Sequence, residues 1–116
     1  MTLTVTSPSN PLIKRLKTLH LKKGRAETGL FLAEGARLAA EASDLGVWPE
    51  TLVYAPEAME RPQVRKLVAG AHAQGVQLIQ TTSRLMADIC KRDNPQTVIG
   101  AYRQRMAALE TLPQAR

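Results

Sequence analysis

The stretch Asn10–Arg37, NPLIKRLKTLHLKKGRAETGLFLAEGAR, sets the order of the first structural elements. Asn10 suits a helix N-cap, and Pro11 suits the first helical position because its missing N–H would have no partner there. A buried helix face is indicated by apolar residues at helical spacing, namely Leu12, Ile13, Leu16 and Leu19. Lys23 would fall on this face. The helix is therefore predicted to end just before Lys23, with Gly24 in the left-handed C′ position.

Beyond this helix, apolar runs alternate with helical patterns. Strands are expected over 29–33, 51–54, 76–79 and 97–102, and helices over 36–43, 62–74 and 83–90, the last capped by Ser83. Such alternation predicts an α/β fold, a three-layer α/β/α sandwich with a mostly parallel sheet of about four strands. Ligands of open α/β sheets gather at the carboxyl ends of strands, which here are Glu34-Gly35, Pro56 and Thr81-Thr82.

Positive charge is concentrated in the opening stretch. It holds seven basic residues against two acidic ones, which is +5 of the chain's net charge of +6. The remainder has nine basic and eight acidic residues. This excess favours a polyanionic partner, most commonly nucleic acid. A solvated lysine-rich helix face, or a docking face for an acidic protein, would give the same pattern.

Composition argues against membrane, secreted and disulfide-bonded proteins. With 116 residues and 44% hydrophobic content, the chain is expected to form one folded domain. No run approaches the roughly 18 apolar residues of a membrane span, and the first ten residues do not resemble a secretory signal, so a cytoplasmic location is expected. Cys90 stands alone and is interpreted as a core residue. His20 and His72 are interpreted as structural or surface residues.

No catalytic, metal-binding or cofactor motif is recognisable in the sequence. The candidates are therefore binding residues. Lys14, Arg15 and Lys22 are expected on one side of the first helix, and Lys23 and Arg25 extend that side into the loop after it, an arrangement that suits consecutive phosphates. Arg37 lies just inside a helix N-terminus, which also favours an anion. Glu34 either caps that helix or pairs with an arginine, or it hydrogen-bonds a ribose or base. Asn94 and Gln96 either form a simple turn or supply amides that contact base or sugar edges.

Few aromatic residues accompany this charge. The chain has one Trp, one Phe and two Tyr, too few for a platform on which several bases stack. Binding through phosphates, shape and a few polar contacts is therefore expected.

Four motifs resemble the amino-terminal substrate-binding domain of the SpoU (TrmH-like) RNA ribose 2′-O-methyltransferases. They are Thr6-Ser7, Asn10-Pro11-x-Ile13-Lys14, Arg25-x-x-x-Gly29-x-Phe31-x-x-Glu34-Gly35-x-Arg37 and Asn94-Pro95-Gln96. Their order and spacing hold over about residues 3–102. Thr97 departs from the pattern, since the family usually has glycine there.

The resemblance implies a sandwich similar to the ribosomal proteins that bind kink-turn RNA. Residues 1–103 would be an RNA substrate-binding domain, and 104–116 a linker toward a catalytic domain that binds S-adenosylmethionine. This chain alone would bind no cofactor or metal and would be inactive. The RNA-binding residues are predicted to be Asn10, Lys14, Arg15, Lys22, Lys23, Arg25, Glu34, Arg37, Asn94 and Gln96.

The expected partner is structured RNA, with ribosomal RNA favoured over transfer RNA, and neither DNA nor a membrane is expected. The fragment is expected to be a monomer and the full-length enzyme a homodimer. The alternative is a stand-alone binder of structured RNA that resembles a small ribosomal protein.

Overall fold

The computed structural model describes residues 2–91 and 97–103 of the chain. In that part the strands are β1 (Thr2–Val5), β2 (Leu30–Glu34), β3 (Thr51–Tyr54), β4 (Gln77–Thr81) and β5 (Val98–Arg103). The α-helices are α1 (Pro11–Lys17), α2 (Lys22–Thr28), α3 (Ala36–Asp44), α4 (Pro62–Ala73) and α5 (Ser83–Cys90). Two short 3-10 helices, η1 (Thr18–His20) and η2 (Pro56–Glu60), complete the described elements.

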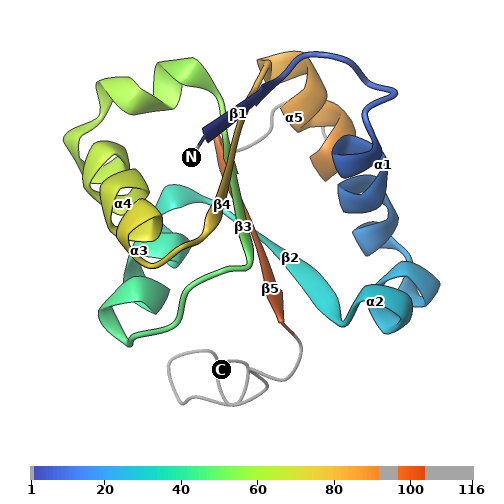
Figure 1. Cartoon of the computed structure of the whole chain (residues 1–116), viewed down its shortest axis with the longest axis horizontal. Coiled ribbons are helices and arrows are strands. Elements are labelled where there is room, and N and C mark those ends of the chain that lie inside the picture. Colours follow the sequence, from blue (N-terminus) through green and yellow to red (C-terminus); the bar gives the residue numbers. More distant parts are fainter. Residues whose placement is uncertain (1, 92–96, 104–116) are drawn as a thin grey trace.

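The elements form three layers, as the sequence predicted. Helices α1, α2 and α5 cover one face of the sheet, and α3 and α4 cover the other (Figure 1). Each face has its own buried core. Ile13, Leu16 and Leu19 lie in the first core, which confirms the predicted apolar stripe, and Val64 and Leu67 of α4 lie in the second. None of the helices in the described ranges is long and apolar enough to span a membrane.

The sheet has five strands in the order β1-β4-β3-β5-β2. β4 pairs in parallel with β1 and β3, whereas β5 pairs antiparallel with both β3 and β2. The expectation of a mostly parallel sheet of about four strands was therefore only partly right. Four strands run one way, but β5 runs the other way and lies between two of them.

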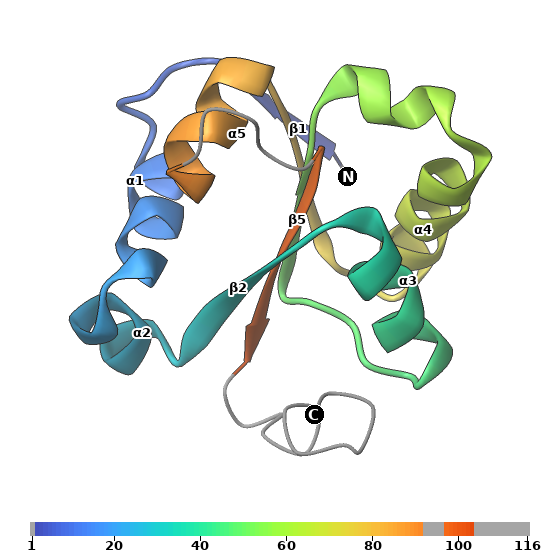
Figure 2. The same ribbon diagram turned by 180° about the vertical axis from the view of Figure 1, so that it is seen from behind.

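Two local features account for this difference. β1 has the short sequence TLTV, is mostly exposed and lies at a sheet edge, so it lacks the apolar signal of a buried strand. α5 has only eight residues and ends at Lys91, which takes the left-handed conformation with φ 56°. After α5, β5 begins at the edge of the sheet where β4 ends and runs back between β3 and β2 (Figure 2).

The first helix ends earlier than predicted. α1 stops at Lys17, and the chain passes through η1 and an extended Leu21 (φ −100°, ψ 139°) before α2 begins at Lys22. Gly24 lies inside α2, where a Cβ atom would be 2.1 Å from the Thr18 carbonyl oxygen. Gly24 is therefore required for a close approach of two backbones. The left-handed cap is Gly29, with φ 71°.

We expect Gly24→Ala to destabilise the fold. Helix propensity alone would make this change stabilising by about 1 kcal/mol. The clash with the Thr18 carbonyl should reverse the sign and cost about 1–3 kcal/mol of unfolding free energy. Urea denaturation measures the difference. Ala26→Gly, at an exposed position of α2, is the control and should cost about 1 kcal/mol. A more stable Gly24→Ala protein would contradict the packing of α2 on η1.

Tyr102 is the largest fully buried side chain of the described residues, with 1% exposure. Its ring stacks on Phe31 at a centroid distance of 6.0 Å. A Cβ at Gly100 would lie 2.5 Å from the Tyr102 ring, so a glycine is needed two residues before it. The Tyr102 hydroxyl has no hydrogen-bond partner in the described part of the chain, and burial raises the pKa of Tyr102 to about 12.

Tyr102→Phe is expected to raise the unfolding free energy at neutral pH by about 1 kcal/mol, because it removes a buried polar atom that lacks a partner. The raised pKa adds a pH dependence. The folded chain keeps the phenol protonated up to about pH 12, so the parent loses stability between pH 10 and 12, the ordinary and folded pKa values. Urea denaturation of both proteins at several pH values in this range isolates the contribution of Tyr102, because all other titrating groups are the same in the two proteins. If the unfolding free energies of the two proteins changed in parallel with pH, the burial of the hydroxyl would be contradicted.

Candidate nucleic-acid interface

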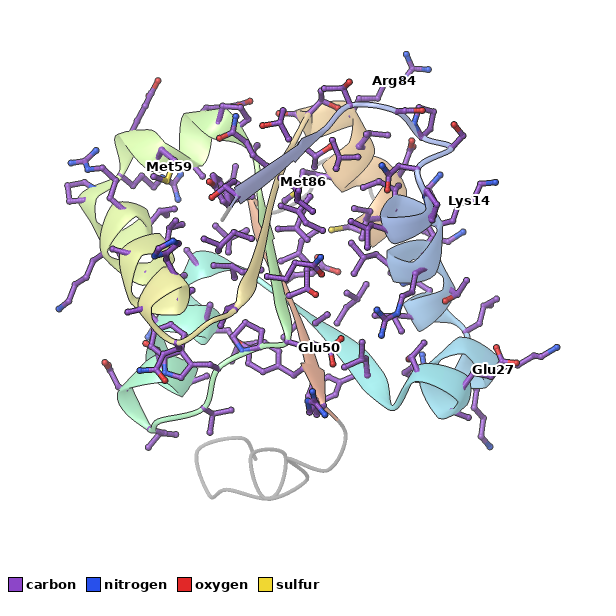
Figure 3. All side chains as sticks on the ribbon, in the orientation of Figure 1. Lys14, Glu27, Glu50, Met59, Arg84 and Met86 are labelled. Carbon is purple, nitrogen blue, oxygen red and sulfur yellow. The ribbon has the colours of Figure 1, made fainter. Side chains whose placement is uncertain are left out.

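Three predicted lysines lie on the outer surface of the layer formed by α1 and α2. Lys14 points away from the sheet (Figure 3), and Lys22 and Lys23 are exposed in the first turn of α2. We call these three residues the lysine face. None of them forms an ion pair or hydrogen bond with another described residue. Their ammonium groups are thus available to an external anion.

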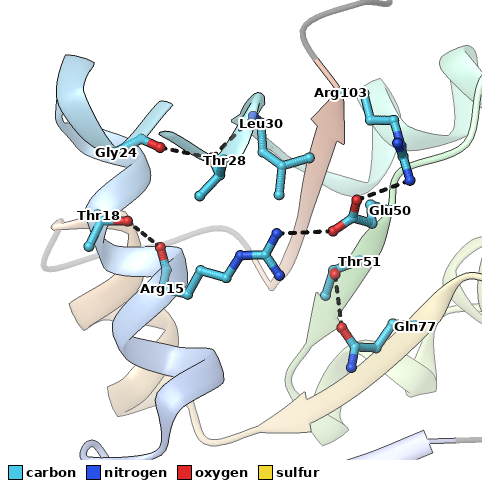
Figure 4. Close-up of polar contacts among 9 residues, drawn as sticks. All are labelled: Arg15, Thr18, Gly24, Thr28, Leu30, Glu50, Thr51, Gln77 and Arg103. Carbon is cyan, nitrogen blue, oxygen red and sulfur yellow. Dashed lines mark hydrogen bonds and ion pairs between the residues drawn. The ribbon is translucent and has the colours of Figure 1, made fainter. Parts of the chain in front are cut away.

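Arg15 is oriented differently from the lysine face. Its Nη2 atom donates to Oε1 of Glu50 at 3.3 Å, and Oε2 of the same carboxylate lies 3.2 Å from Nη2 of Arg103 (Figure 4). The prediction that Arg15 shares one helix side with Lys14 and Lys22 was wrong, because α1 ends before Lys22 and Arg15 turns toward Glu50. Glu50 precedes β3 and Arg103 ends β5, so this cluster lies at the amino end of β3.

Arg25 also has a partner within the chain. Its Nη1 atom donates to the Leu19 carbonyl oxygen at 3.0 Å, and the side chain is half-buried. This bond holds α2 against η1. His20 of η1 contacts the Ile89 carbonyl oxygen through Nε2, which links η1 to α5 and fits the structural role expected for this histidine.

Three other predicted residues, Asn10, Glu34 and Arg37, lie at the opposite edge of the sheet. Since β1, β2, β3 and β4 run in one direction, their carboxyl ends share this edge, which we call the strand-end edge. Asn10 lies in the loop after β1 and caps α1, its Oδ1 accepting from Leu12 N at 2.8 Å. Glu34 is the last residue of β2, with a buried Oε1 atom. Asn94 and Gln96 lie outside the described residues.

Arg37 follows at the start of α3 and is 90% exposed. Its Nε atom donates to Glu41 Oε2 at 3.4 Å, an exposed pair of little strength that an external anion can replace. The N-cap position of α3 is taken by Gly35 at φ 110°, whose N–H donates to Val98 O at 2.8 Å. A side chain at position 35 would be strained, which explains the glycine between Glu34 and the helix.

One contact at the strand-end edge had no signal in the sequence. Ser83 Oγ donates to Glu57 Oε2 at 2.6 Å and so joins α5 to η2. This bond, followed by a backbone bond of Glu57 itself, lowers the pKa of Glu57 below its usual 4.5. The cap of α5 is Thr82, whose Oγ1 accepts from Leu85 N at 3.1 Å, so the prediction that Ser83 caps this helix was wrong. Ser83 instead turns toward η2.

The geometry defines a three-layer domain with an exposed basic flank and polar residues at its strand ends. Residues 10–100 match the family model described as the MRM3-like substrate binding domain. The chain therefore belongs to this family, which confirms the resemblance to SpoU-type substrate-binding domains. A search of curated proteins gave no match.

Solved structures agree with this assignment. An rRNA methyltransferase from Sinorhizobium meliloti is 39% identical with a TM-score of 0.79, over 90% of this chain and 38% of that one. An RNA 2′-O ribose methyltransferase is 29% identical with a TM-score of 0.70, over 87% of this chain and 37% of that one. The chain thus spans well under half the length of these enzymes.

A smaller protein shares the fold. The 15.5 kD RNA binding protein of Giardia lamblia has a TM-score of 0.56 at 18% identity, over 86% of this chain and 80% of that protein. The likeness at this identity concerns the fold alone.

Ser83→Ala should return the pKa of Glu57 toward 4.5, because the hydroxyl is the larger cause of the lowered value. A carbon-detected NMR titration of the Glu57 carboxyl measures this. The stabilising effect of the contact is present above pH 4.5 and is lost as the pH falls through the lowered pKa. Ser43→Ala, whose hydroxyl donates to the Ala40 carbonyl oxygen, is the control and should leave Glu57 unchanged. An unshifted Glu57 in Ser83→Ala would contradict the contact between α5 and η2.

Proposed function

We propose that this chain is the RNA-recognition domain of a SpoU-type ribose 2′-O-methyltransferase, with ribosomal RNA favoured over transfer RNA as substrate. It holds the RNA so that one ribose reaches a catalytic domain, which binds S-adenosylmethionine and transfers the methyl group. The observation that carries the proposal is the lysine face: Lys14, Lys22 and Lys23 are exposed and have no partner among the described residues. Membership of a substrate-binding domain family supports RNA as the anion that this charge contacts.

The two regions of the candidate interface contribute differently. The lysine face neutralises phosphates, and this part of the binding carries no sequence information. The strand-end edge offers the guanidinium of Arg37 and the carboxylate of Glu34, which suit a sugar or base edge. Asn94 and Gln96, which lie outside the described residues, remain predicted RNA contacts on the family motif alone. Residues 1–103 constitute the RNA-binding domain, and 104–116 lead toward the catalytic domain. By itself the chain transfers no methyl group.

The alternative function is a stand-alone binder of structured RNA. The exposed lysine face would serve such a binder equally well, because phosphate contacts need no catalytic domain. Methylation of ribosomal RNA by the complete gene product, detected as resistance of one ribose to alkaline cleavage, separates the two. A third function, docking of an acidic protein, would leave the chain without affinity for structured RNA.

Charge reversal of the lysine face should weaken RNA binding without unfolding the domain. In Lys14→Glu/Lys22→Glu/Lys23→Glu, each lost phosphate contact lowers the log-log salt slope of the affinity by about 0.7–0.9. Each exposed substitution should change the unfolding free energy by about 0.5 kcal/mol at most. Fluorescence anisotropy with a labelled ribosomal RNA fragment, measured over a salt series, gives the slope, and thermal melts check folding.

Arg61→Glu is the control for this experiment, since Arg61 is an exposed basic residue on the other helical layer. A single reversal there should weaken binding less than Lys22→Glu alone. Equal effects would mean that affinity follows net charge and has no preferred face. A triple variant that binds as tightly as the parent at every salt concentration would exclude the lysine face as the phosphate contact.

A further inference from the structure

A second concave surface lies on the opposite layer, between α3 and α4. The two helices pack beside each other, and a hollow of about 440 Å³ opens between them. This volume falls in the range of about 300–1,000 Å³ that small-ligand sites occupy. We call it the α3–α4 groove, and it is lined by Ala40, Ser43, Asp44, Trp48, Gln63, Lys66, Leu67 and Gly70.

Trp48, the only tryptophan of the chain, forms part of the groove wall. The side chain is half-buried against the second core. A Cβ atom at Gly70 would lie 2.7 Å from Cη2 of the indole, so the benzene end of Trp48 contacts the backbone of α4. Gly70 thus leaves room for a large aromatic ring at a position where any other residue would displace it.

Three polar side chains surround this aromatic wall. Lys66 and Gln63 come from α4 and Asp44 from α3, and all three are exposed. None has an ion pair or hydrogen bond to another described residue. The groove therefore combines a cation, a carboxylate acceptor and an amide with an indole ring, and no other described residue pairs with these polar groups.

A nucleotide matches each of these groups. Unpaired bases stack on aromatic side chains, a phosphate pairs with an ammonium group, and the base edge offers donors and acceptors. A carboxylate accepts hydrogen bonds from exocyclic amino groups, which adenine has and uracil lacks. A carboxylate beside the cation would disfavour a site for inorganic phosphate alone, which makes the base the larger part of the recognition.

We propose that the α3–α4 groove binds one unpaired nucleotide, with its base against Trp48, its amino group on Asp44 and its phosphate on Lys66. This inference rests on the proposed function, in that an RNA held by the domain supplies the nucleotide. Helices α3 and α4 lie across the sheet from α1 and α2 (Figure 1), so the groove and the lysine face belong to opposite layers. It would therefore recognise a nucleotide outside the segment whose phosphates the lysine face contacts.

The fluorescence of Trp48 reports directly on the groove, because the chain has no other tryptophan. The probes are adenosine 5′-monophosphate, uridine 5′-monophosphate and inorganic phosphate, with excitation at the red edge of the tryptophan band, where the bases do not absorb. We expect saturable quenching by the adenine nucleotide, weaker quenching by the uridine nucleotide and none by phosphate. Lys66→Glu should weaken binding of the adenine nucleotide about tenfold. Asp44→Ala, which removes the acceptor, should abolish the preference for adenine.

Lys14→Glu is the matched control, since it reverses an exposed lysine on the other layer. It should leave nucleotide quenching within about twofold of the parent while it weakens binding of structured RNA. Absence of quenching at millimolar nucleotide would overturn the inference, and so would quenching that Lys66→Glu does not change. Equal competition by phosphate would show an anion site only. A blue shift of Trp48 emission that grows with protein concentration would show a second copy in the groove.

The same variants distinguish failure of the groove from failure of the proposed function. If structured RNA still binds in a salt-dependent manner but no nucleotide quenches Trp48, only the groove is excluded. If nucleotides quench Trp48 but structured RNA does not bind, the proposed function fails, and with it the inference that RNA supplies the nucleotide.

Discussion

The antiparallel placement of β5 between β3 and β2 is the constraint on which the rest of the structure depends. β2 has no other strand partner in the described sheet, so β5 alone joins it to the β1-β4-β3 block. Because β5 is antiparallel to both neighbours, β2 and β3 point the same way and their carboxyl ends meet at one edge. That meeting brings Glu34 and Arg37 to the same side of the molecule as the loop that carries Asn10.

The arginines and lysines of the opening stretch have separate roles in the structure. Arg15 pairs with Glu50 and Arg25 donates to the Leu19 carbonyl, whereas Arg37 has only its weak exposed pair with Glu41. The lysine face has no such partners within the described ranges. This division follows from side-chain chemistry, because a planar guanidinium holds fixed hydrogen bonds while an ammonium group remains hydrated. The positive charge of this stretch therefore both stabilises the fold and leaves cations for a ligand.

The sequence predicted the features that depend on neighbouring residues. The stripe of Ile13, Leu16 and Leu19, the strand at 51–54 and the helix that begins at Pro62 follow from local periodicity and capping. Family motifs led to the substrate-binding class. Features that depend on distant contacts could not be predicted. The break at Leu21 depends on the close approach of Gly24 to the Thr18 carbonyl. Arg15 points away from the lysine face because it pairs with Glu50, which is 35 residues away.

The same distinction explains why only one of the two candidate binding surfaces could be predicted from the sequence. The lysines are close together in the sequence, whereas the α3–α4 groove joins Trp48 to side chains of two separate helices and has no sequence motif. The sheet lies between the two surfaces, so one RNA that contacts both must pass around an edge.

At the amino end of β3, Glu50 presents a carboxylate held by Arg15 and Arg103. At the strand-end edge, Arg37 is 90% exposed and carries only a weak pair. The strand-end edge also carries the carboxylates of Glu34 and Glu57, so charge does not favour it over the edge at Glu50. What distinguishes the strand-end edge is that the family motifs place Asn10, Glu34 and Arg37 there.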